Sequence, residues 1–142
     1  IREAAIQTTG ARLLAAAGER YRGCRLDTFA IANADPQAKR QRTVVSVLRE
    51  YVAALPGRLA KREGIVFYGP VGTGKDHLAY AVAREFVLAG KSLVWLNGQD
   101  WFGELRDAMD SETPESRMVN RIARPGLVPV GTYKFPTDGA RP

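Results

Sequence analysis

Hydrophobic residues between Asp35 and Gly57 have the spacing of an amphipathic helix. Asp35-Pro36 is typical of an N-cap followed by proline in the first helical turn, and Pro56-Gly57 is typical of a helix end. Between them the apolar positions recur every three or four residues and define one helix face: Val44, Leu48, Tyr51, Val52 and Leu55. Before this helix, the alanine-rich residues 3–20 also favour a helix, which Gly10 weakens. We expect that earlier helix to be a loosely attached arm.

Two short apolar runs predict buried strands. Ile65–Tyr68 and Ser92–Leu96 are continuous rather than alternating, as expected of parallel strands that are covered on both faces. Between them the pattern predicts a helix that stops at Gly90 and turns these residues inward: Leu78, Ala79, Val82, Ala83 and Phe86. The order strand, helix, strand predicts a βαβ unit, and thus an α/β fold with a parallel sheet flanked by helices.

Two further helices and a tail complete the pattern. Asp100–Met109 is amphipathic, and the residues expected inward are Trp101, Phe102, Leu105 and Met109. Thr113-Pro114 is typical of a helix start, and the residues expected inward after it are Met118, Val119 and Ile122. Leu127–Val130 has the composition of a third strand, but Pro129 argues against a central position in a sheet.

Composition narrows the class of protein. The chain has 142 residues, of which 45% are apolar, so one globular domain is expected. Its apolar runs are too short for a membrane span and it starts with no signal-peptide pattern, so we expect a cytoplasmic protein without a membrane partner. The single cysteine, Cys24, excludes an internal disulfide and a cysteine-based zinc cluster. We interpret it as a partly buried structural residue.

Positive charge is concentrated in the first part of the chain. Residues 1–62 carry 12 lysines and arginines against 5 aspartates and glutamates, whereas residues 63–142 carry 9 against 10. Such asymmetry points to an acidic partner, with nucleic acid as the first candidate, or to a solvated basic face without a partner. Within it, Lys39, Arg40 and Arg42 lie at the start of the predicted helix and are the candidate DNA-binding residues.

The strongest chemical signal follows the first predicted strand. Gly69, Gly74 and Lys75 match the first seven positions of the phosphate-binding pattern G-x-x-x-x-G-K-[ST]. Glycines let such a loop turn its N–H groups inward, and the next helix points its positive dipole end at the same place. Lys75 adds a charge for the β- and γ-phosphates. The candidate nucleotide-binding residues are Gly69, Pro70, Val71, Gly72, Thr73, Gly74, Lys75, Asp76 and His77.

Asp76 departs from this pattern. The position usually carries a Ser or Thr hydroxyl that binds Mg²⁺. A carboxylate can also bind Mg²⁺, but it repels nearby phosphates. Asp76 is thus the candidate metal ligand. His77, the only histidine, is interpreted as structural. A P-loop ATPase further needs an acid at the end of a later strand. After Glu115 the only acid is Asp138, so efficient hydrolysis is not expected and the catalytic residues are unknown.

These motifs together resemble a known family. Tyr-Gly-Pro-Val-Gly-Thr-Gly-Lys at 68–75, His77-Leu78-Ala79, the entry segment Arg25–Phe29 and the basic helix at 37–55 are similar to the AAA+ ATPases of the DnaC helicase-loader and IstB transposition-helper family. The resemblance extends through Gly90-Lys91-Ser92 and Glu104-Leu105-Arg106, and covers about residues 21–123.

The resemblance implies an ATP-binding protein with an AAA+-like P-loop fold, here truncated at its C-terminus. It implies ATP and Mg²⁺ as cofactors, and DNA, a replicative helicase or a transposase, and further copies of itself as partners. The expected organisation is an N-terminal arm and entry segment at 1–34, an ATP-binding domain at 35–124, and an irregular tail rich in proline and glycine at 125–142.

Two alternatives stay open at this point. One is a small P-loop kinase, for which Arg117, Arg121 and Arg124 could imitate an arginine-rich lid. The other is a non-catalytic interaction module that binds nucleotide only for stability.

Overall fold

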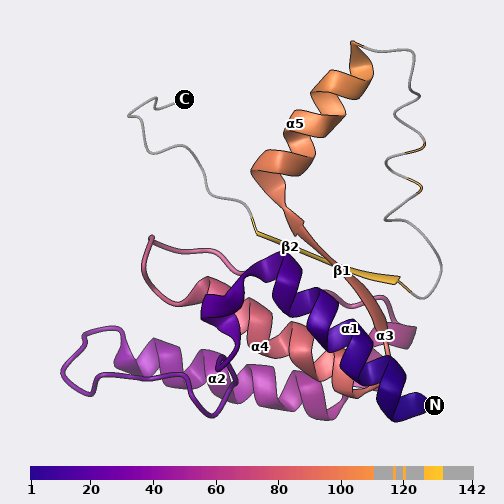
Figure 1. Cartoon of the computed structure of the whole chain (residues 1–142). Coiled ribbons are helices and arrows are strands. Elements are labelled where there is room, and N and C mark those ends of the chain that lie inside the picture. The colour runs from indigo at the N-terminus through magenta and orange to yellow at the C-terminus, as the bar shows by residue number, and fades with distance from the viewer. Residues whose placement is uncertain (111–116, 118–119, 121–126, 133–142) are drawn as a thin grey trace. The chain divides into compact units, whose positions relative to one another are not determined.

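The computed structural model describes residues 1–110, 117, 120 and 127–132 (Figure 1). The chain divides into two compact units, residues 1–90 and residues 91–142. The first unit is helical and contains the glycine-rich loop of residues 69–74. The second contains a pair of strands and a helix. No helix among the described residues is long and apolar enough to cross a membrane.

The first unit is built around the helix α4, Lys75–Leu88, which packs against both α1, Arg2–Ala17, and α2, Ala38–Ala53 (Figure 1). Because α4 has neighbours on two sides, its burial extends around the helix rather than along one stripe. Its buried residues include all five that the sequence pattern placed inward: Leu78, Ala79, Val82, Ala83 and Phe86. The start and end of this helix are confirmed as predicted.

The N-terminal helix is not a loose arm. Leu13 on α1 is buried, and Gly10 lies close to Val87 of α4, where an added Cβ would be 3.8 Å from the valine side chain. The helix ends at Gly18, and the 3₁₀ turn η1, Glu19–Tyr21, buries Tyr21. Small residues along α1 allow this close approach, and so the expectation of loose attachment is corrected.

The predicted boundaries of α2 are corrected at both ends. Asp35 is not the N-cap. Its carboxylate accepts a hydrogen bond from the Gln37 amide at 2.7 Å, one turn before the helix starts. At the other end Pro56 does not stop a helix but lies in the first turn of the next one, α3, Leu55–Ala60, where proline is tolerated. The buried face is set by Val45, Leu48 and Tyr51 and continues into Leu55, whereas Val44 is 40% exposed.

The predicted strand Ile65–Tyr68 is not formed. A strand needs a neighbour for its backbone hydrogen bonds, and residues 1–90 contain no strand in this structure. Burial nevertheless alternates along the segment, as it does in an extended chain with one covered face. Ile65 and Phe67 are half-buried, whereas Val66 and Tyr68 are exposed. The βαβ unit expected around α4 is therefore absent from the described residues.

The second unit contains a different parallel pair. The strand β1, Ser92–Asn97, pairs in parallel with β2, Leu127–Thr132, with Ser92 opposite Leu127 and Asn97 opposite Thr132. The strand at Ser92–Leu96 is thus confirmed. Pro129 does not prevent β2 from forming, because each strand of a two-stranded sheet is an edge strand, where proline is tolerated.

The helix α5, Gly98–Met109, follows β1 directly. Trp101 and Leu105 are partly buried as predicted, but Phe102 and Met109 are 46% and 64% exposed, and Ala108 is buried instead. The less exposed face of α5 is therefore formed by residues 101, 105 and 108. The sequence pattern pointed to residues 102 and 109 instead, because their side chains are larger and apolar. The helix start predicted at Thr113-Pro114, with the inward positions 118, 119 and 122, lies outside the described residues.

Candidate functional site: the loop before α4

The loop from Gly69 to Gly74 has the backbone that its glycines predict. Gly69, Gly72 and Gly74 have φ angles of 140°, 80° and 83°, in a region that residues with a Cβ rarely adopt. Gly74 is also the N-cap residue of α4, which begins at Lys75. The loop therefore ends at the N-terminus of a helix that is 14 residues long, with unpaired N–H groups in its first turn.

The side chain of Lys75 folds back over this loop. Its ammonium Nζ donates hydrogen bonds to the carbonyl oxygens of Gly69 at 2.9 Å and Pro70 at 2.6 Å, and lies 3.4 Å from Thr73 Oγ1. The Thr73 hydroxyl in turn donates to the Pro70 carbonyl at 2.9 Å. The positive charge is thus held at the loop itself, at the place where phosphate oxygens would be bound.

Asp76 is held from outside the loop. The hydroxyl of Tyr21 lies 3.3 Å from Asp76 Oδ2, and Arg20 Nη2 donates to the same hydroxyl at 2.5 Å. The Tyr21 ring stacks on Tyr80 of α4 with centroids 5.7 Å apart. Burial, and then the charge of Asp76, raises the pKa of Tyr21, so the phenol keeps its proton at neutral pH. The local sequence around Tyr21 gives no signal for this contact, which joins residues 55 positions apart.

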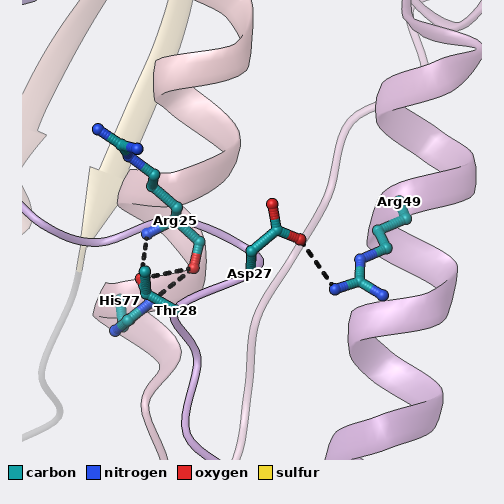
Figure 2. Close-up of polar contacts among 5 residues, drawn as sticks. All are labelled: Arg25, Asp27, Thr28, Arg49 and His77. Atoms are coloured by element: carbon teal, nitrogen blue, oxygen red, sulfur yellow. Dashed lines mark hydrogen bonds and ion pairs between the residues drawn. The ribbon is translucent and has the colours of Figure 1, made fainter.

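His77 binds the entry segment Arg25–Phe29 rather than the loop (Figure 2). Its Nε2 lies 2.9 Å from the carbonyl oxygen of Arg25, so this nitrogen carries the proton. Its ring also contacts Phe29 edge-on at 5.2 Å between centroids. The structural interpretation of His77 agrees with this geometry.

The entry segment itself is closed by a local turn and tied to α2. Thr28 Oγ1 accepts a hydrogen bond from the Arg25 amide at 2.9 Å, and Asp27 forms an ion pair of 3.0 Å with Arg49 (Figure 2). Nearby, Cys24 is half-buried, and burial raises its pKa, as suits a structural thiol. The segment therefore bridges α2 and the start of α4.

A pocket of about 570 Å³ opens beside the loop. Its walls come from α2, from the extended residues 65–70 and from Phe29, and it reaches Thr73 and Lys75. Most of its lining is apolar, with Arg40, Gln41 and Lys75 among the polar residues. The Oε1 atom of Gln41 is buried and has no hydrogen-bond partner within the described part of the chain. The volume lies in the range of small-molecule sites.

The three candidate DNA-binding cations are all exposed at the start of α2, but their surroundings differ. Arg40 lines the pocket that also holds Lys75. Arg42 donates to Asn33 Oδ1 at 2.9 Å. Sequence reasoning therefore missed that one of the three cations belongs to the surroundings of the loop.

Comparisons with known proteins show the family of this chain. A family model described as "IstB-like ATP binding protein" matches residues 41–134. The chain belongs to this family. The family is one of P-loop proteins, so membership supports a P-loop fold and ATP as the ligand of this IstB-like chain.

Curated relatives of the IstB-like chain are helicase loaders. It is 27% identical over 119 residues to the replicative helicase loader DnaC of Escherichia coli K12, a match that covers 83% of this chain and 45% of the relative. It is 26% identical over 121 residues to DnaC of Buchnera aphidicola subsp. Baizongia pistaciae, covering 82% and 46%. The chain thus spans about half the length of the curated relatives it matches. No solved structure gives a significant match.

Proposed function

We propose that this chain binds ATP together with Mg²⁺ at the loop of residues 69–77 and couples the nucleotide state to DNA or to a replication or transposition partner. One observation carries the proposal: the Lys75 ammonium, a loop of glycines with positive φ and the N-terminus of α4 meet at one place. Each of these three groups favours an anion, and together they suit the β- and γ-phosphates.

The contacts of Lys75 support phosphate binding at this loop. Its ammonium now donates to two backbone carbonyls, which are neutral acceptors. A phosphate oxygen carries negative charge, so exchanging a carbonyl for it adds the attraction between opposite charges to the hydrogen bond. The base and sugar would then extend into the pocket beside the loop, between α2 and residues 65–70.

Asp76 fits a magnesium ion that the phosphates share. Mg²⁺ is usually held by one or two carboxylates together with phosphate oxygens and waters. The described residues contain no cluster of three or more histidines, cysteines or acids. A metal at Asp76 would therefore depend on the nucleotide for its other ligands, and its charge would offset the repulsion between the carboxylate and the phosphates.

Binding without efficient turnover is the expected outcome. Phosphoryl transfer in P-loop ATPases uses an acid at the end of a strand. Here β1 ends at Asn97 and β2 ends at Thr132, so neither described strand ends in a carboxylate. We further propose that these two strands belong to an AAA+-like parallel sheet.

The basic N-terminal part supports the second half of the proposal. The relatives are named as replicative helicase loaders, and Lys39, Arg40 and Arg42 give this chain an exposed cationic helix start. Electrostatic contact with DNA, docking to a helicase or transposase, and assembly into a homo-oligomer are the proposed uses of the ATP-bound form.

Calorimetric titration with ATP, with and without Mg²⁺, tests this function when phosphate release is followed in the same samples. We expect saturable binding that Mg²⁺ strengthens, with phosphate release no faster than in the Lys75→Ala variant. Absence of saturable binding would overturn the nucleotide site. Turnover well above that variant would overturn the expectation of binding without hydrolysis.

A further inference from the structure

Tyr21 is buried where η1 contacts Asp76, the second residue of α4. Its side chain is 8% exposed, and its ring stacks on Tyr80. The Arg20 guanidinium lies over the same ring, 4.6 Å from its centroid. The ring is therefore held by two neighbours, and they restrict the position of its hydroxyl.

The direction of the hydrogen bonds follows from counting protons. The Tyr21 hydroxyl has one proton, and the Arg20 guanidinium has donors only. Arg20 donates to the Tyr21 oxygen, and the Tyr21 hydroxyl donates to Asp76 Oδ2 at 3.3 Å. Each hydrogen bond is therefore donated toward Asp76, from Arg20 to the phenol and from the phenol to the carboxylate. The other carboxylate oxygen, Asp76 Oδ1, can face a cation.

Tyr21 acts alongside two other contacts of the same chain segment. Phe29 covers Gly74, and the Arg25 carbonyl accepts a hydrogen bond from His77. Residues 74, 76 and 77 are therefore all held by residues between 21 and 29. Of these contacts, only the one from Tyr21 reaches a charged group of the nucleotide site.

We propose that Tyr21 is a positioning residue for Asp76, which holds the carboxylate in the orientation that binds the magnesium ion of Mg²⁺–ATP. The inference rests on the proposed nucleotide site. It adds that η1, and through it the N-terminal helix α1, contributes to metal affinity. Tyr21 itself is not proposed to contact the nucleotide or the metal ion.

The variant Tyr21→Phe tests this role, because it keeps the stacked ring and removes only the hydroxyl. The measurement is the affinity for ATP as a function of Mg²⁺ concentration, by calorimetry or with a fluorescent ATP analogue. We expect the Mg²⁺ midpoint to rise about threefold to tenfold, the range of one hydrogen bond, and ATP binding in EDTA to stay unchanged. Tyr51→Phe is the matched control, since that buried tyrosine donates to the Glu63 carbonyl at 2.7 Å instead.

Two further variants make the test specific. In an Asp76→Ala background, Tyr21→Phe should no longer shift the Mg²⁺ midpoint, because the group that it positions is gone. Arg20→Gln, at an exposed residue, should raise the midpoint in the same direction but less. If Tyr21→Phe fails to fold by circular dichroism, Arg20→Gln decides the question.

The outcomes separate the inference from the function on which it rests. An unchanged midpoint in Tyr21→Phe, with ATP binding that still depends on Lys75, overturns the role of Tyr21 alone. The same midpoint shift with and without Asp76 also overturns it. Absence of ATP binding by the wild-type chain overturns both the site and the inference.

Discussion

The ring of Phe29 occupies the space that a side chain at Gly74 would need. An ideal Cβ on residue 74 would lie 2.4 Å from Phe29 Cε2, and Gly74 has a φ angle of 83°. Glycine at the N-cap of α4 is therefore required for two reasons: its backbone conformation and its aromatic neighbour. This contact also shows that the entry segment reaches the glycine-rich loop.

Replacement of Gly74 by alanine should destabilise the protein. The left-handed backbone alone costs about 1–2 kcal/mol for a residue with a Cβ, and the contact with Phe29 adds to it. Urea denaturation measures the loss in the free energy of unfolding. Gly57→Ala is the control, because nothing lies within 4 Å of a Cβ there and the residue is in helix α3. It should be neutral or stabilising by up to about 1 kcal/mol. Equal effects of the two substitutions would contradict this account.

Alkaline pH should weaken the fold through its buried tyrosines. Burial is the main cause that raises the pKa of Tyr21, Tyr51 and Tyr80 above the ordinary value of 10.0. The folded state thus favours the protonated phenols, and their contribution to stability is complete below pH 10 and lost as the pH rises through the folded-state values. The free energy of unfolding, measured in urea at several pH values, should fall above about pH 10. Tyr51→Phe should make that fall shallower. If the variant kept the wild-type dependence of unfolding free energy on pH, Tyr51 would not contribute to the fall.

The conformation of the glycine-rich loop could be predicted from sequence because its requirements are local. Three glycines, one lysine and a helix start lie within eight consecutive residues, and each has the predicted conformation or place. The contacts of Asp76 with Tyr21 and of Gly74 with Phe29 could not be predicted, because they join residues about 50 positions apart through tertiary packing.

Strand predictions succeeded only where a partner strand is present. Ser92–Leu96 pairs with β2 and is a strand, whereas Ile65–Tyr68 has an equally strong pattern and no neighbouring strand within its unit. Helix positions were easier, but the inward residues of α5 were partly misassigned. Phe102 and Met109 are large and apolar yet exposed, and the small Ala108 takes the buried place.

Arg40 should contribute to nucleotide binding, whereas Lys39 should not. Both are exposed cations at the start of α2, but only Arg40 lines the pocket that contains Lys75. Arg40→Ala should weaken ATP binding by about 1 kcal/mol, the typical worth of a partly exposed charged contact. Calorimetry on Lys39→Ala provides the matched control. Similar ATP affinities for the two variants would show that the pocket does not receive the nucleotide.

DNA binding should be electrostatic and tolerant of sequence. Lys39 and Arg42 are exposed at the same helix start and do not line the pocket. Replacing both by alanine should weaken binding to unrelated duplexes and flatten the plot of log K against log salt by about two units. Titration of labelled DNA at several salt concentrations measures this. A double variant with the wild-type slope would move the DNA surface away from α2 and favour a protein partner.

The most direct test of the nucleotide site is the melting temperature of the wild-type chain and of Lys75→Ala, each with and without Mg²⁺–ATP. A ligand at a hundredfold excess over its Kd stabilises the folded state by about 2.7 kcal/mol, or roughly 8 °C for a chain of this length. The account predicts that shift for the wild type, in which the Lys75 ammonium contacts the carbonyls of Gly69 and Pro70. In Lys75→Ala, which lacks the ammonium, it predicts that the shift is almost completely lost. An equal shift in both proteins would contradict the assignment of residues 69–77 as the ATP site.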